Sequence, residues 1–265
     1  MLRAIRSEFL KYFTTRLWWG MAIAIVASAV LFTVFFAFVF VELMPETTPD
    51  TMPPMEPVQL ANSVYTAGLQ VGYLLLLTIG VLQIGSEYRH KTITATFLAN
   101  PRRMQALLAK AVALVGIAIL NGLLSIVAST AVGALMLQLL GSDPWPSNEI
   151  LRTLALSLLV LAVWALIGLG IGILIPNQVA ALLIAVGVAW IVEPLVTFGL
   201  GFWEWAAQNV VQYLPTQATS AVINTIDSGT GAARLSWWGG SLVLVAYALV
   251  LAGLGIWRAT REDVG

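Results

Sequence analysis

The chain has 265 residues, of which 59% are hydrophobic and only 10% are charged. Soluble domains carry roughly 25% charged residues, so this composition excludes a water-soluble globular domain, and the mean hydropathy of +0.90 agrees. A formal net charge of zero excludes a basic nucleic-acid-binding protein. The sequence has no cysteine and one histidine, His90, which excludes disulfides, thiolate metal sites and histidine-clustered metal sites.

Long apolar runs predict an all-α integral membrane protein with one transmembrane domain over residues 1–265. A helix needs about 20 mostly apolar residues to cross the hydrocarbon core. Six runs meet that length, at 18–41, 62–85, 107–139, 152–175, 179–200 and 237–257. They are continuous rather than alternating blocks, which argues against a closed β-barrel.

The basic residues predict the orientation, because cytoplasmic loops are rich in Lys and Arg. Only Arg152 and Arg234 fall on the opposite side from the rest. We therefore expect a multi-pass protein of the plasma or inner membrane with both termini in the cytoplasm. The residues that predict the cytoplasmic side are Arg3, Arg6, Lys11, Arg16, Arg89, Lys91, Arg102, Arg103, Lys110, Arg258 and Arg261.

The N-terminal segment 1–16 has the pattern of an amphipathic helix that lies in the membrane interface. Its apolar stripe consists of Leu2, Ile5, Phe9, Tyr12 and Phe13, and its other faces carry Arg3, Arg6, Ser7 and Lys11. Two interpretations remain open for this helix. It is either a simple interfacial anchor or an elbow helix that also contacts a partner.

Two outer connections have different predicted structures. Segment 43–59 contains five prolines and predicts an extended, irregular cap. Segment 201–236 includes FWEWAAQNVVQYL, whose amphipathic spacing predicts a helix that Pro215 ends. We expect a short helix or helical pair here that re-enters the outer leaflet before the last span.

The inner connection 86–103, SEYRHKTITATFLANPRR, is the long polar stretch on the cytoplasmic side. Ile93 and Phe97 are four residues apart, so they share a helical face. Asn100 precedes Pro101, which ends the helix because a residue before proline avoids the α region. The segment is either a solvated loop that sets the topology or a surface that binds a partner.

Three segments, in order, resemble the type-2 exporter permeases of the ATP-binding-cassette family. EYRHKTITATFLANPRRMQALLAKAV is similar to the family's connection between the second and third spans. GLGIGILIPNQVAALLIAVGVAWIVEPLV resembles its hairpin of the fourth and fifth spans, including Glu193-Pro194, and QYLPTQATSAV its re-entrant region. The order and spacing of the three segments are more specific than any one of them.

The resemblance implies a permease subunit that binds no cofactor itself, while a separate ATPase, in two copies, binds ATP and Mg²⁺. The sequence has no phosphate-loop motif. The resemblance also implies a second permease subunit, identical or paralogous, and export of a small molecule, lipid or drug-like substrate. A helix at 87–98 would lie in a cleft of the ATPase, with Ile93 and Phe97 as anchors. The implied coupling residues are Glu87, Tyr88, Arg89, His90, Lys91, Thr92, Ile93, Thr96 and Phe97.

Polar residues inside the spans give the candidates for a translocation path. Glu193 is an acid well inside the fifth span, where ionisable side chains usually face protein or a water-filled cavity. It contacts substrate or a gate in one interpretation, and stabilises the kink at Pro194 in the other. Asn121, Ser125 and Ser129 repeat every four residues on the third span. They line the path or, as we favour, form a helix–helix interface. Gly168 and Gly172 have close-packing spacing.

Two other functions compete with transport. An aquaporin-like channel requires two Asn-Pro-Ala motifs, and Asn100-Pro101 is followed here by Arg102-Arg103. An intramembrane enzyme requires paired acids, a metal set or a serine with a base inside the spans. The spans offer one deep carboxylate and no histidine, so neither alternative is favoured.

Overall fold

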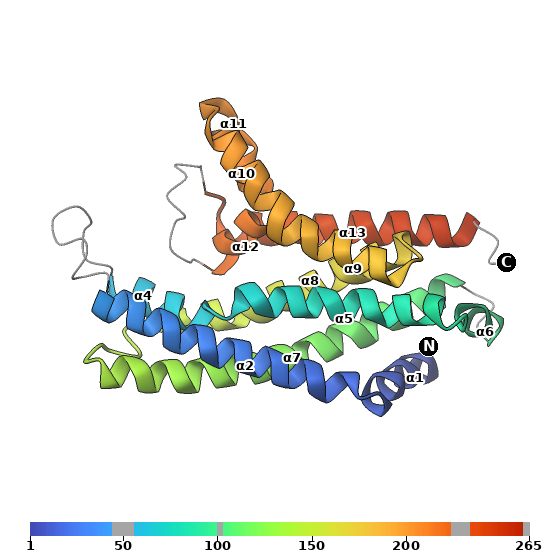
Figure 1. Ribbon diagram of the computed structural model, residues 1–265, viewed down its shortest axis with the longest axis horizontal. Coiled ribbons are helices and arrows are strands. Elements are labelled where there is room, and N and C mark those ends of the chain that lie inside the picture. The colour runs from blue at the N-terminus through green and yellow to red at the C-terminus, as the bar shows by residue number, and fades with distance from the viewer. Residues whose placement is uncertain (44–55, 100–102, 224–233, 262–265) are drawn as a thin grey trace.

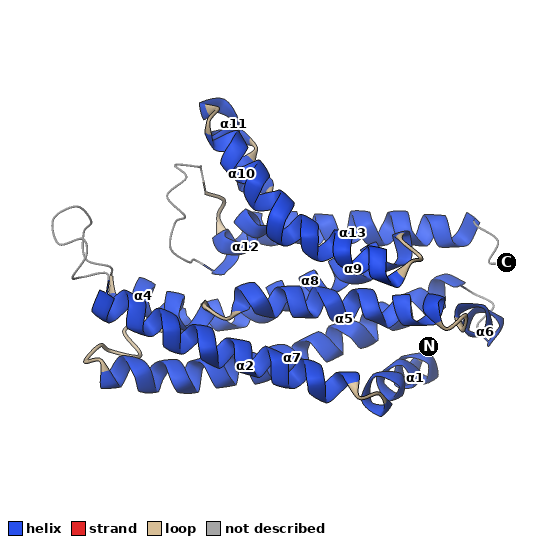
Figure 2. Ribbon diagram, in the orientation of Figure 1, coloured by secondary structure: helices blue, strands red, loops and turns tan. Residues whose placement is uncertain are grey.

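A computed structural model describes residues 1–43, 56–99, 103–223 and 234–261. All regular structure in these residues is helical (Figure 2). Six helical segments are long and apolar enough to cross a membrane: Leu17–Leu43, Pro57–Arg89, Arg103–Leu139, Glu149–Leu174, Gln178–Gly201 and Trp237–Arg258. This confirms the all-α membrane class and the six predicted runs.

The N-terminal half consists of helix α1 and three spans (Figure 1). α1 is Leu2–Thr14, and the first span joins α2, Leu17–Phe38, to a π-helical turn, η1, Val39–Leu43. The second span joins α4, Pro57–Thr66, to α5, Leu69–Arg89. A short helix, α6, Ile93–Ala99, precedes α7, Arg103–Leu139, which at 1.5 Å per residue is about 55 Å long.

The C-terminal half begins with α8, Glu149–Leu174. The fifth span consists of α9, Gln178–Gly187, a π-helical turn, η2, Val188–Val192, and α10, Glu193–Gly201. Three short elements follow: α11, Glu204–Asn209, the 3-10 turn η3, Val211–Tyr213, and α12, Pro215–Ile223. The last span is α13, Trp237–Arg261. In Figure 1, α10 and α11 diverge from the other spans.

Two details differ from the predicted connections. Residues 57–59 are already helical because Pro57 occupies the first turn of α4, where its missing N–H is not needed. Residues 44–55 of the proline-rich cap lie outside the described residues. Pro215 begins α12 for the same reason, so it starts a helix instead of only ending one.

Close packing of α5 against α8 forms the centre of the bundle. A Cβ atom added at Gly80 would lie 2.1 Å from the carbonyl oxygen of Ala165, and one added at Gly168 would lie 2.1 Å from that of Leu77. At Gly172 the nearest atom would be Cγ2 of Ile84, 2.6 Å away. The predicted packing role of Gly168 and Gly172 is confirmed, because only glycine lets the two backbones approach so closely.

The N-terminus, α6 and the end of α13 lie at one end of the bundle (Figure 1). We call this the basic end, and it comprises the described residues 1–16, 86–99, 103–106, 175–178 and 257–261. The turn between α8 and α9 lies there, and Asn177 caps α9 by accepting hydrogen bonds from the backbone N–H groups of Val179 and Ala180. The cytoplasmic location of the basic end remains a prediction.

Candidate functional site at the basic end

Helix α1 packs against the spans through a face that combines part of its apolar stripe with an acid. Glu8 and Tyr12 are buried, whereas Leu2 and Phe13 of the predicted stripe are 83% and 39% exposed. Phe9 is half-buried and lies against Gly116 of α7, where an added Cβ would come within 2.6 Å of the ring. An acid, not only the aromatic residues, is therefore turned toward the bundle.

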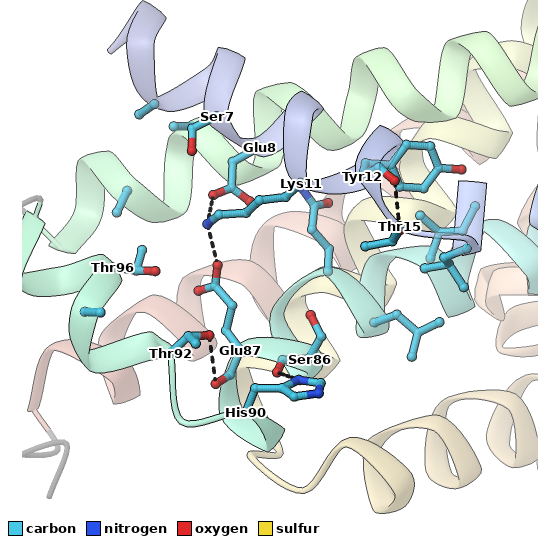
Figure 3. Close-up of a pocket in the computed structure, with 18 of the residues that line it drawn as sticks. Ser7, Glu8, Lys11, Tyr12, Thr15, Ser86, Glu87, His90, Thr92 and Thr96 are labelled. Carbon is cyan, nitrogen blue, oxygen red and sulfur yellow. Dashed lines mark hydrogen bonds and ion pairs between the residues drawn. The ribbon is translucent and has the colours of Figure 1, made fainter. Parts of the chain in front are cut away.

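Glu8 belongs to a network of four charged side chains that we call the charge cluster: Glu8, Lys11, Glu87 and Lys110. The Lys11 ammonium lies 2.7 Å from Glu8 Oε1 and 2.7 Å from Glu87 Oε1. The Lys110 ammonium lies 2.7 Å from Glu8 Oε2 and 2.6 Å from Glu87 Oε1. Figure 3 shows Lys11 between the two carboxylates. The cluster ties α1 to the end of α5 and the start of α7.

Lys110 is fully buried, and Glu8 and Glu87 are each 6% exposed. Removing such charges from water is costly unless they are paired and hydrogen-bonded. Two acids and two bases give the charge cluster no net charge, and each ammonium contacts both carboxylates. The mutual pairing therefore compensates for burial at a point where three helices meet.

The pKa values of α1 follow from the same contacts. Burial alone would raise the pKa of Glu8, but Lys110 and Lys11 more than offset it, and the pKa lies below its ordinary value. Burial alone would lower the pKa of Lys11, but the bonds to Glu8 and Glu87 raise it above its ordinary value. Burial also raises the pKa of Tyr12, partly opposed by a hydrogen bond from Asn121. Both members of the α1 pair are thus held in their charged forms.

The predicted coupling segment is interrupted where a continuous helix over 87–98 was expected. α5 ends at Arg89, and Lys91 has a φ of 55°, a left-handed conformation that breaks the helix. The backbone N–H of Thr92 then donates to the carbonyl of Glu87, and His90 Nδ1 lies 2.8 Å from the carbonyl of Ser86. Arg89, His90, Lys91 and Thr92 are exposed, and Tyr88 is half-buried.

Ile93 does not face outward as an anchor for a partner. It is 3% exposed and belongs to the main hydrophobic core of the bundle. Leu98, which sequence reasoning did not select, is instead 79% exposed on α6. The Phe97 side chain lies outside the described part of the structure, and Thr96 is half-buried. The role of the coupling residues in binding an ATPase remains a prediction.

A cavity of about 760 Å³ lies beside the charge cluster. α1, α5, α6, the start of α7 and Gln178 at the start of α9 line it. Glu8, Lys11 and Glu87 form part of its polar wall, together with Thr96 and His90 (Figure 3). Four of the predicted coupling residues, Glu87, His90, Thr92 and Thr96, therefore line the same cavity as the N-terminal helix.

Glu193 lies in a second polar site, near the other end of the bundle. It is 5% exposed, and its Oε1 accepts hydrogen bonds from the backbone N–H of Thr216 at 2.6 Å and from the Thr216 hydroxyl at 2.7 Å. Thr216 is in the first turn of α12, so Glu193 caps that helix from a different span. The Trp164 indole donates to Thr219 Oγ1 at 2.9 Å and holds α12 against α8. This geometry favours a structural role for Glu193, as the cap of α12 and not through the kink at Pro194 that the sequence suggested.

The polar stripe on α7 is buried among helices. Asn121, Ser125 and Ser129 are each 3% exposed or less. Asn121 Nδ2 donates to the Tyr12 hydroxyl at 3.2 Å and to the carbonyl of Ile117 at 2.9 Å. Ser129 donates to the carbonyl of Ile126. These contacts favour the packing interpretation over a path, and they extend the attachment of α1 to α7.

Sequence reasoning missed Glu8 and Lys110 as a pair. Lys110 was interpreted as a topology-setting charge, although it falls inside the predicted run 107–139. A cation inside a span normally has a named partner, and Glu87 lies at the end of the neighbouring span. That rule was the available signal, but it does not identify Glu8, which is 102 residues away in the chain.

Comparison with known proteins leaves the family of this chain open. No protein-family model matches it. No curated protein matches it either.

Proposed function

We propose that the chain is the membrane-spanning permease subunit of an ATP-driven exporter, energised by a separate ATPase that binds at the basic end. The observation that carries the proposal is α6, a short helix between the second and third spans. One side of α6 is exposed, and the other side packs against the spans. Leu98 is exposed and is preceded by the exposed cations Arg89 and Lys91, while Ile93 packs into the core of the spans.

This arrangement suits the transmission of force. A partner that bound the exposed side of α6 would act on helices whose ends are joined by the charge cluster. Since packed interfaces move as rigid bodies between discrete arrangements, displacement of α6 would be passed to α5, α7 and α1 together. The substrate class, a small molecule, lipid or drug-like compound, rests on the family resemblance alone.

Copurification tests the proposal. The tagged chain is purified from its native membrane, the accompanying proteins are identified by mass spectrometry, and ATP hydrolysis is measured. We expect a phosphate-loop ATPase in a fixed ratio to the chain. A preparation that carries no ATPase, and whose vesicles conduct solute without ATP, contradicts the proposal.

A variant then tests where the ATPase binds. Leu98→Asp places a charge on the exposed side of α6 and should release the ATPase while the chain remains folded in the membrane. Leu139→Asp is the matched control, because Leu139 is 71% exposed at the opposite end of α7. Equal recovery of the ATPase with both variants shows that α6 is not the docking element.

A further inference from the structure

The cavity beside the charge cluster is large, mostly apolar and open to its surroundings. Its volume of about 760 Å³ falls within the range of about 300–1,000 Å³ that is typical of small-molecule sites. Leu17, Ile79 and Leu82 form part of its wall, and Leu17 is exposed where the first span begins. Apolar surface that a hydrocarbon chain covers is removed from water, which is favourable. The wall therefore suits a ligand with an apolar tail.

The charged group that the cavity presents is a cation. The side chains of Glu8 and Glu87 are each 7% exposed, whereas that of Lys11 is 46% exposed. Both oxygens of Glu8 and Oε1 of Glu87 accept hydrogen bonds from lysine, and Glu87 Oε2 is buried. Ser7 and Thr15, on the same helix as Lys11, are also exposed and line the cavity (Figure 3). A ligand in the cavity thus reaches an ammonium group and hydroxyl groups.

Lys11 retains a donor for such a ligand. An ammonium group has three N–H bonds, and that of Lys11 makes one hydrogen bond to Glu8 and one to Glu87. The complementary group is an acceptor, and an anionic oxygen forms a stronger hydrogen bond with an ammonium than a neutral one does. A cationic head group would instead be repelled by Lys11.

The charges around the cavity also favour an anion. Five exposed cations lie at the basic end: Arg3, Arg6, Arg16, Arg89 and Lys91. The acids among the described residues of this end are Glu8 and Glu87, and both are paired within the charge cluster. The exposed cations therefore give the surroundings of the cavity a positive potential, which attracts anionic ligands.

We propose that this cavity binds an amphiphile with an anionic phosphate or carboxylate head group, which accepts a hydrogen bond from Lys11 while its hydrocarbon tail lies along Leu17, Ile79 and Leu82. An anionic phospholipid of the surrounding membrane and a free fatty acid share this chemistry. The bound ligand adds contacts between α1 and α5, which the charge cluster already joins. The inference rests on the cavity and its charges and does not depend on the proposed transport function.

The first test compares ligands that differ in head-group charge. The intact chain is reconstituted in nanodiscs with equal amounts of dioleoylphosphatidylglycerol and dioleoylphosphatidylcholine, and the retained lipid is measured by native mass spectrometry. Choline places a cation near Lys11, so we expect at least about fivefold preference for phosphatidylglycerol, the size of effect of one basic residue near an anionic lipid. In nanodiscs of phosphatidylcholine alone, added oleate is compared with oleyl alcohol.

The two comparisons distinguish the sources of the ligand. Preference for phosphatidylglycerol identifies a membrane phospholipid, and preference for oleate alone identifies a free fatty acid. If neither anion is preferred over its uncharged or zwitterionic counterpart, the proposal is wrong.

A pair of variants then locates the head group. Ser7→Glu places an acid on the cavity wall, four residues before Lys11, and should remove most of the preference for the anion. Thr14→Glu adds the same charge to an exposed position of the same helix that is not part of the cavity wall, so most of the preference should remain. Equal preference in the two variants shows attraction by the general charge of the basic end and overturns the cavity as the site.

A second pair of variants tests the position of the tail. Ala95→Trp fills the cavity from the exposed side of α6, whereas Ala27→Trp adds the same side chain to an exposed position of α2 outside the cavity. Retention of the anionic ligand should fall at least severalfold with Ala95→Trp alone. Equal retention by the two variants overturns the placement of the tail in the cavity.

Discussion

Replacing Lys110 with methionine tests whether the charge cluster holds α1 against the spans. The variant keeps a side chain of similar length and removes the two contacts of 2.7 Å and 2.6 Å to Glu8 and Glu87. The cluster then carries a net charge of −1, with two buried carboxylates that share Lys11. Removing one partner of a buried ion pair typically costs 3–5 kcal/mol. Because Lys11 still contacts both acids, we expect the free energy of unfolding to fall by about 3 kcal/mol, at the lower end of that range.

The assay combines thermal unfolding in detergent with hydrogen exchange of the α1 amides. We expect both global destabilisation and loss of protection in α1, because local opening of that helix no longer breaks the Lys110 contacts. Adding Glu8→Gln restores neutrality between Lys11 and Glu87. The double variant should therefore lose less stability than the two single variants lose together. We expect the coupling free energy between the two substitutions to be about 1 kcal/mol or more.

Arg6→Met is the matched control, because Arg6 is an exposed cation on the same helix. Its effect should stay within about 0.5 kcal/mol. If Lys110→Met destabilises the chain no more than Arg6→Met does, and the α1 amides keep their protection, the reasoning about the charge cluster is wrong.

Three further predictions concern other contacts. Glu193→Ala should expose α12 to hydrogen exchange and lower the free energy of unfolding by about 1–2 kcal/mol, since it removes a helix cap. Glu193→Gln should retain part of the cap. Equal exchange in the original protein and both variants would argue against this role. Gly80→Ala should destabilise the chain in thermal unfolding by about 1–3 kcal/mol through overpacking, whereas Gly187→Ala, with no atom within 4 Å of its added Cβ, should be neutral or stabilising. The lowered pKa of Glu8 gives stability that is present above its ordinary value and lost as pH falls through the lower one. The protection of α1 should accordingly hold near neutral pH and fall in acid before the rest of the bundle unfolds, and protection of α1 that is lost only together with that of the other helices would refute the linkage.

The spans could be predicted from the sequence because crossing a membrane requires a long apolar run whatever its neighbours are. The six predicted runs agree with the observed helices to within about five residues at every end. The largest difference is at the start of the second span, since the polar residues of α4 extend it to Pro57. Apolar content marks the hydrocarbon core, but it does not mark where a helix begins.

The sites depended on contacts between distant segments, which no local pattern encodes. Glu193 could be singled out as a buried acid, but its partner Thr216 is 23 residues away and on another helix. The apolar stripe of α1 correctly predicted a helix, but it did not indicate that Glu8 is turned toward the bundle, because that acid is stabilised in the interior by pairing with Lys110. Polar side chains of α1 are placed by partners that only the folded bundle brings near.

The hydrogen bonds between Thr216 and Glu193 join the two ends of segment 193–216, so that this segment forms a closed loop. Because both ends are held, the entropic cost of closing the loop increases by only about 0.6 kcal/mol for each doubling of its length. The tip, where Phe202 and Trp203 are 79% and 62% exposed, is thus the place where added residues disturb the bundle least. An epitope inserted there would mark the face opposite α1 and report on which side of the membrane it lies.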